Sequence, residues 1–220
     1  LAKNNGRNRV EIYISSSSPI TAPVSRRSFL LAVPATLIMA SRGKAFEGRT
    51  KFYDLRTARE ISECLIEEHT VAILSSGEIS TNPLQYNQCV AVVIRDGNRF
   101  VLAHLTPGEA RKDASGKLQR EDFNAEEKQE IANNFISLLK QNGFEPKELT
   151  ANFIYTYNEY FNPQFIEELR GKFKLIKEYR FNEMQVIVEA NAENSTLTVY
   201  SDSIIGLNFG KLAEYKIGLD

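Results

Sequence analysis

Two apolar stretches joined by a short polar turn constrain the fold of this chain more than any other feature. Residues 90–94 and 100–103 are apolar at every position, and Asp96-Gly97 between them is a strong β-hairpin signal. Alternate residues of a strand point to opposite faces, so both faces of this hairpin are apolar. Such strands belong inside a sheet that is covered on both sides. The hairpin therefore predicts a layered domain with these strands at its centre.

The segments around the hairpin predict an α+β domain with a mixed, mainly antiparallel β-sheet and helices packed outside it. Helical spacing of apolar residues predicts helices over 54–69 and 125–142, and Pro163 predicts the start of a third over 164–173. A polar, charged stretch at 109–123 predicts a loop. Runs rich in β-branched and aromatic residues predict strands over residues 71–74, 86–95, 98–106, 149–160, 175–181, 184–190 and 196–200.

A second motif lies upstream of the domain. Ser25-Arg26-Arg27-Ser28-Phe29-Leu30 resembles the twin-arginine export signal at every defined position, with Arg26 and Arg27 as the signal pair. The apolar stretch 29–40 has the length of a signal-peptide core, and small residues precede a cut after Ala45. A buried core helix and an uncleaved membrane anchor are the alternatives. The resemblance predicts a signal peptide over 24–45 and export of the protein to the periplasm or beyond.

The signal divides the chain into three parts. Residues 46–220 are long enough for one domain with its own core. No Met precedes the signal, and Val24 stands where an initiator is expected, so we expect residues 1–23 to be a non-native or disordered leader. The net charge of −1 provides no global field for nucleic acid or an anionic membrane. We therefore expect no nucleic-acid partner, and no membrane association after signal cleavage.

The hairpin also brings together a cysteine and a histidine. If Asp96 and Gly97 form a two-residue loop, Arg95 faces Asn98 and Cys89 lies directly opposite His104. Facing residues share a side of the sheet with Cβ atoms about 5 Å apart. A thiol and an imidazole at that distance can form a thiolate–imidazolium pair, which makes cysteine nucleophilic at neutral pH. A buried structural cysteine beside an ordinary histidine is the simpler interpretation of the same residues.

The region around this pair resembles the chemoreceptor glutamine deamidases of the CheD family. The likeness rests on Gly77-Glu78, on Cys89-Val90-Ala91-Val92-Val93 and on Ala103-His104-Leu105-Thr106-Pro107. The same Cys–His pair occurs in the deamidase domains of cytotoxic necrotizing factors. The resemblance implies hydrolysis of a glutamine side-chain amide in a partner protein, with Cys89 as nucleophile and His104 as acid–base group.

The resemblance also suggests supporting roles. Backbone N–H groups of Gln88 and Cys89 are the natural oxyanion donors. Members of the family commonly carry a threonine upstream of the cysteine that orients the histidine, for which Thr81 is a candidate beside Gln85 and Asn87. The reaction needs no cofactor or metal. Two histidines and no clustered acids also argue against a zinc site.

Two other functions compete with deamidation. An exported binding or envelope protein with the same fold would leave the cysteine idle. Cys64 and Cys89 are the chain's two cysteines, and an oxidising compartment favours a Cys64–Cys89 disulfide that would block the nucleophile. A different cysteine hydrolase, such as a peptidase or a transglutaminase-like enzyme, would share the Cys–His pair. The sequence leaves these alternatives, the substrate protein and the oligomeric state open.

Overall fold

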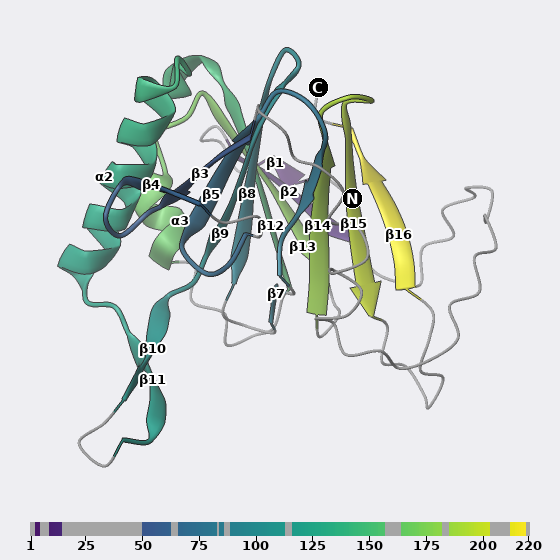
Figure 1. The fold of residues 1–220 in the computed structure, drawn as a ribbon. Coiled ribbons are helices and arrows are strands. Elements are labelled where there is room, and N and C mark those ends of the chain that lie inside the picture. The colour runs from purple at the N-terminus through teal and green to yellow at the C-terminus, as the bar shows by residue number, and fades with distance from the viewer. Residues whose placement is uncertain are drawn as a thin grey trace.

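The described part of the chain folds into three layers. The computed structural model describes residues 3–4, 9–14, 50–62, 66–82, 84–85, 89–112, 116–156, 164–181, 185–202 and 212–218. Helices α2 (Ala125–Gln141) and α3 (Gln164–Leu169) form the first layer, a long sheet the second and a smaller sheet the third (Figure 1). The predicted α+β class, with mixed, mainly antiparallel sheets and helices outside, is confirmed.

The central layer is a nine-stranded sheet. Its order is β1 (Lys3–Asn4), β2 (Arg9–Ile14), β13 (Leu175–Phe181), β12 (Thr150–Thr156), β8 (Val90–Asp96), β9 (Arg99–Leu105), β5 (Thr70–Leu74), β3 (Thr50–Asp54) and β4 (Arg59–Ile61). The β2–β13 and β13–β12 pairs are parallel and the others antiparallel. The β8–β9 hairpin therefore lies in the middle of the sheet, as its two apolar faces require.

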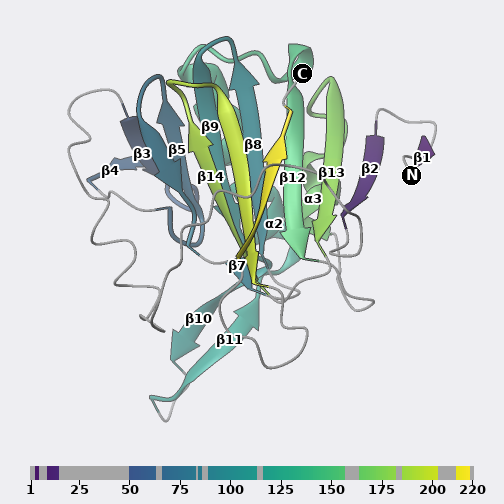
Figure 2. The same ribbon diagram turned by 90° about the vertical axis from the view of Figure 1, so that its right-hand side faces the viewer.

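The third layer lies against the other face of the long sheet, in front of β8 and β12 in Figure 2. It runs in the order β16 (Leu212–Ile217), β15 (Thr196–Asp202), β14 (Gln185–Asn191) and β6 (Glu78–Ser80), and β7 (Leu84–Gln85) also pairs with β14. Strands β10 (Gly108–Lys112) and β11 (Leu118–Asp122) form a separate hairpin that projects from the body (Figure 1). A 3₁₀ turn, η1 (Pro146–Glu148), precedes β12.

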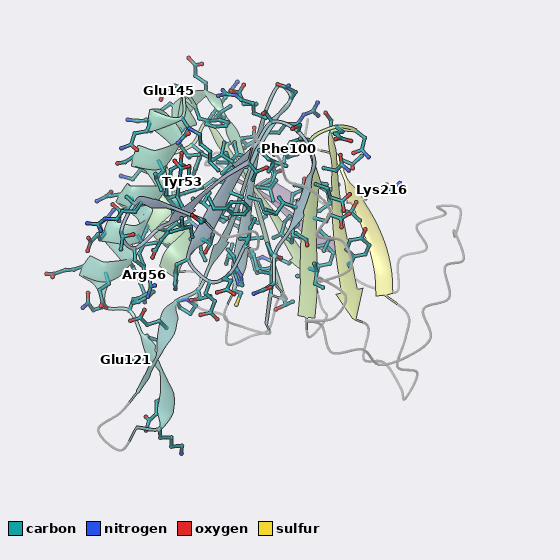
Figure 3. All side chains as sticks on the ribbon, in the orientation of Figure 1. Tyr53, Arg56, Phe100, Glu121, Glu145 and Lys216 are labelled. Carbon is teal, nitrogen blue, oxygen red and sulfur yellow. The ribbon has the colours of Figure 1, made fainter. Side chains whose placement is uncertain are left out.

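Each face of the β8–β9 hairpin belongs to its own hydrophobic core. Val90, Val92, Val101 and Ala103 pack with the helices, whereas Ala91, Val93, Phe100 and Leu102 pack with the smaller sheet. Figure 3 labels one residue of each core, Tyr53 and Phe100. The Tyr53 hydroxyl also donates a hydrogen bond of 3.1 Å to Asn142 Oδ1 at the end of α2. Successive residues of each strand thus alternate between two separate cores.

Helix α2 forms where its capping residues and apolar stripe predict it. The Asn124 side chain accepts a hydrogen bond from the Glu127 N–H, and the Glu127 carboxylate accepts one from the Asn124 N–H. Gly143, with a φ of +75°, follows the helix in the left-handed conformation. The buried stripe of α2, with Ile131 and Phe135 at its centre, covers the sheet.

Two predicted segments differ from the structure. Residues 54–69 are not a helix: β3 ends at Asp54, residues 55–58 form a turn, and β4 follows. The Asp54 carboxylate accepts a hydrogen bond of 2.7 Å from the Arg56 N–H, and this Asx turn competes with a helix start. Ala58 then takes a φ of +54°, which breaks a helix.

The other difference concerns residues 109–123, which we expected to form a loop. They form most of the β10–β11 hairpin, in which polar side chains are tolerated because the hairpin stands apart from both cores. Figure 3 labels Glu121 on this hairpin and Arg56 near its base. The Arg56 guanidinium forms a 2.6 Å ion pair with the Glu109 carboxylate on β10, which ties the hairpin to the turn after β3.

The N-terminal part of the chain contributes two strands. Residues 3–4 and 9–14 form β1 and β2, and β2 pairs with β13. That residues 1–23 are a non-native or disordered leader stays a prediction. The twin-arginine motif with Arg26 and Arg27 lies outside the described residues, so the signal peptide over 24–45 stays a prediction. Within the part of the chain that the structure describes, no helix is both long and apolar enough to span a membrane.

Candidate functional site

The turn of the β8–β9 hairpin determines how the candidate cysteine and histidine are placed. Asp96 faces Arg99, so the two loop residues are Gly97 and Asn98 rather than Asp96 and Gly97. Gly97 has a φ of +61°, as the first loop position of a type II′ turn requires. Asp96 also forms an ion pair with Arg99 across the turn. The prediction that Arg95 faces Asn98 is therefore wrong: the last facing pair before the loop is Asp96 with Arg99, one position further along each strand.

This shift moves the cysteine and the histidine from a facing to a diagonal arrangement. His104 faces Ala91, and Cys89 lies two residues before Ala91 in the chain. Because the period of a strand is two, Cys89 and His104 still share one face of the sheet. Diagonal neighbours of this kind lie within reach of long side chains such as histidine. The predicted direct opposition is wrong, but the shared face is retained.

The shared face is the one between the two sheets. Cys89 belongs to the core that the long sheet forms with β14 and β15, and its side chain is 2% exposed. His104 is also 2% exposed. Cys89 immediately precedes β8 and His104 is the second-last residue of β9, so both lie at the same end of these central strands. A thiol and an imidazole are thus placed together in a water-poor environment.

Two threonines that the sequence analysis did not single out accompany the pair. Thr70 on β5 faces His104 and is buried. Thr156, the last residue of β12, is buried as well. The strand alternation of 150–156 was visible in the sequence, but the pairing of β12 with β8 is a contact between distant segments that local patterns do not specify.

Of the residues predicted to support the pair, Thr81 lies within the described part of the chain and the others lie wholly or partly outside it. The Thr81 hydroxyl accepts a 3.2 Å hydrogen bond from the Val188 N–H, and the Thr81 N–H donates to the Val188 carbonyl at 2.9 Å. These bonds tie Thr81 to β14 of the smaller sheet. Gln88, Asn87 and Cys64 lie outside the described residues, as does the side chain of Gln85.

The chain's other histidine, His69, lies at the base of the projecting hairpin. Its N–H donates to the His104 carbonyl at 2.7 Å, and its backbone is left-handed with a φ of +60°. The Thr106 hydroxyl donates to the Gly108 carbonyl, so it accepts its 2.9 Å bond from His69 Nε2–H. The ring also lies 5.0 Å from the Phe123 ring. His69 Nδ1 is buried without a hydrogen-bond partner among the described residues.

This environment makes the stability of the protein depend on pH. Burial lowers the pKa of His69 below its usual 6.5, and the Gly108 carbonyl opposes this shift only in part. The unfolded chain therefore binds a proton more readily than the folded one as the pH falls below about 6.5. We expect the urea midpoint to decrease as the pH is lowered from 7.5 to 5.5. The decrease should be smaller in His69→Asn, which lacks the titrating ring, and asparagine tolerates the positive φ at this position. Equal pH dependence in both proteins would contradict this assignment.

Together, the fold and the site define a class: a three-layer α+β protein with a cysteine and a histidine on one buried face of its central sheet. No protein-family model matches the chain, and no curated protein sequence matches it. Among solved structures, the C-terminal domain of CNFy from Yersinia pseudotuberculosis is similar over 70% of this chain, with 8% identity and a TM-score of 0.30. The match spans 61% of that chain, and at this level it establishes no shared site or activity.

Proposed function

We propose that this protein is an exported cysteine amidohydrolase that deamidates glutamine side chains of a partner protein. The observation that carries the proposal is the placement of Cys89 and His104 on one buried face of neighbouring strands. In a water-poor site a thiolate–imidazolium pair forms where the attraction between the two charges outweighs the loss of their hydration. The resemblance of residues 77–107 to glutamine deamidases supports the choice of substrate.

The reaction would proceed in two covalent steps. The imidazole of His104 takes the thiol proton, and Cys89 Sγ attacks the carbon of the glutamine carboxamide. The C–N bond breaks as the imidazolium returns its proton to the nitrogen, so ammonia leaves and a thioester remains. Water then attacks the thioester with His104 as base, the C–S bond breaks, and glutamate and the thiol are formed. Backbone N–H groups at Gln88 and Cys89 would stabilise the oxyanion.

Export is a separate part of the proposal, and it rests on the motif around Arg26 and Arg27. An exported deamidase would meet its substrate in the periplasm or outside the cell.

The proposal predicts a substrate preference that is open to a direct test. The full chain, kept reduced, is incubated with peptides that carry either glutamine or asparagine at one position between otherwise identical residues. We expect ammonia release and the matching mass change with the glutamine peptides, and at least a tenfold slower reaction with asparagine, because a side chain shorter by one methylene does not reach Sγ. Peptide-bond cleavage without ammonia release would favour a peptidase instead.

The burial of Cys89 also favours a second candidate function, an exported binding or envelope protein without catalysis. In that case Cys89 is a core residue, or it is joined to Cys64 by a disulfide in the oxidising compartment. Mass spectrometry of the protein purified from the periplasm, alkylated with and without reduction, distinguishes the two. A Cys64–Cys89 disulfide in the exported form would support the binding protein.

A further inference from the structure

Thr156 carries a buried hydroxyl near the candidate site. Its side chain is 1% exposed, and Oγ1 has no hydrogen-bond partner among the described residues. Leaving a buried hydroxyl unpaired is unfavourable, because the group gives up its hydrogen bonds to water without replacing them. Valine has almost the same shape and avoids this cost, so packing alone does not explain a threonine here.

The register of the sheet places this hydroxyl beside the cysteine. Tyr155 on β12 faces Val90 on β8, and the next pair along both strands is Thr156 with Cys89. Ile154 and Cys89 both belong to the core between the two sheets, so Thr156, two residues after Ile154, points to that same side. Facing residues of antiparallel strands have Cβ atoms about 5 Å apart.

The histidine lies on the other side of the cysteine. His104 is on β9 and Thr156 is on β12, and β8 with Cys89 runs between these two strands. The cysteine is therefore flanked within one sheet by an imidazole and by a hydroxyl. A thiolate in a water-poor site needs both a positive charge and hydrogen-bond donors to replace its lost hydration. The imidazolium of His104 provides the charge, and Thr156 provides a donor from the opposite side.

We infer that Thr156 is a positioning residue, which donates a hydrogen bond from its hydroxyl to the thiolate of Cys89. The inference rests on the proposed function and deepens it. No covalent bond to Thr156 forms or breaks: the thiol proton moves to His104, and the hydroxyl turns from its unpaired orientation toward Sγ. The contact stabilises the thiolate more than the thiol, since hydrogen bonds to charged groups are the stronger ones.

The test is the pH dependence of the alkylation of Cys89 by iodoacetamide in the full chain, followed on the Cys89 peptide by mass spectrometry. Thr156→Val removes the hydroxyl and keeps the shape, whereas Thr156→Ser keeps the hydroxyl. We expect the midpoint to rise by about one pH unit in the valine variant and to stay near wild type in the serine variant. Thr198→Val on β15 is the matched control, because Thr198 is buried on the alternate side from Leu197 and Val199.

Each outcome separates this inference from the proposed function. An unchanged midpoint in a folded Thr156→Val protein overturns the role of Thr156, and leaves the proposed function intact if His104→Asn still raises the midpoint. A wild-type midpoint near 8.5, as in an ordinary thiol, counts against the proposed function. In that case a further rise in Thr156→Val still supports the hydrogen bond. If the valine variant does not fold, Thr156→Ala gives the same comparison.

Discussion

Replacing Cys89 by serine is expected to lower glutamine-amide hydrolysis by a factor of about 10³ or more. The two side chains differ in one atom, so the buried position between the sheets still accommodates the residue. A serine hydroxyl, however, has a far higher pKa than a thiol, and one imidazole does not ionise it at neutral pH. The variant therefore retains the fold and loses the nucleophile. Ammonia release from the glutamine peptides measures the loss.

The chain offers its own control for this substitution. Cys64 is the second cysteine, and Cys64→Ser is expected to leave the rate within about twofold of wild type, since the mechanism assigns it no step. Circular dichroism and the urea midpoint of both variants show whether the fold is intact. Full activity in Cys89→Ser, or loss of activity in Cys64→Ser alone, would show that the nucleophile has been assigned to the wrong residue.

Local patterns predict the centre of the fold well. The β8–β9 hairpin can be predicted because both faces of its strands are apolar. Helix α2 can be predicted because Asn124 and Glu127 cap its first turn. The helix expected over 54–69 fails because the spacing of a few apolar residues does not reveal the Asx turn at Asp54. The strands of the projecting hairpin were missed because polar residues pair as well as apolar ones where no core is nearby.

The candidate site shows a similar limit at finer scale. The sequence Asp96-Gly97-Asn98 contains two overlapping turn signals, Asp-Gly and Gly-Asn, and the chain uses the second. The choice changes the facing of Cys89 and His104 without changing their shared side, because each strand moves by one position. Thr156 became visible only through the pairing of β12 with β8, two segments about 60 residues apart whose contact depends on the whole sheet.

The most direct test of the Cys89–His104 pair is the rate at which iodoacetamide alkylates Cys89 at pH 7 in the full chain. An ordinary thiol is only a few per cent thiolate at this pH, whereas a thiol paired with imidazolium is mostly ionised. We predict that His104→Asn slows alkylation about tenfold or more, and that His69→Asn, the matched change at the chain's other histidine, does not. Equal rates in wild type and His104→Asn, with both proteins folded, would contradict the pair and with it the proposed enzyme.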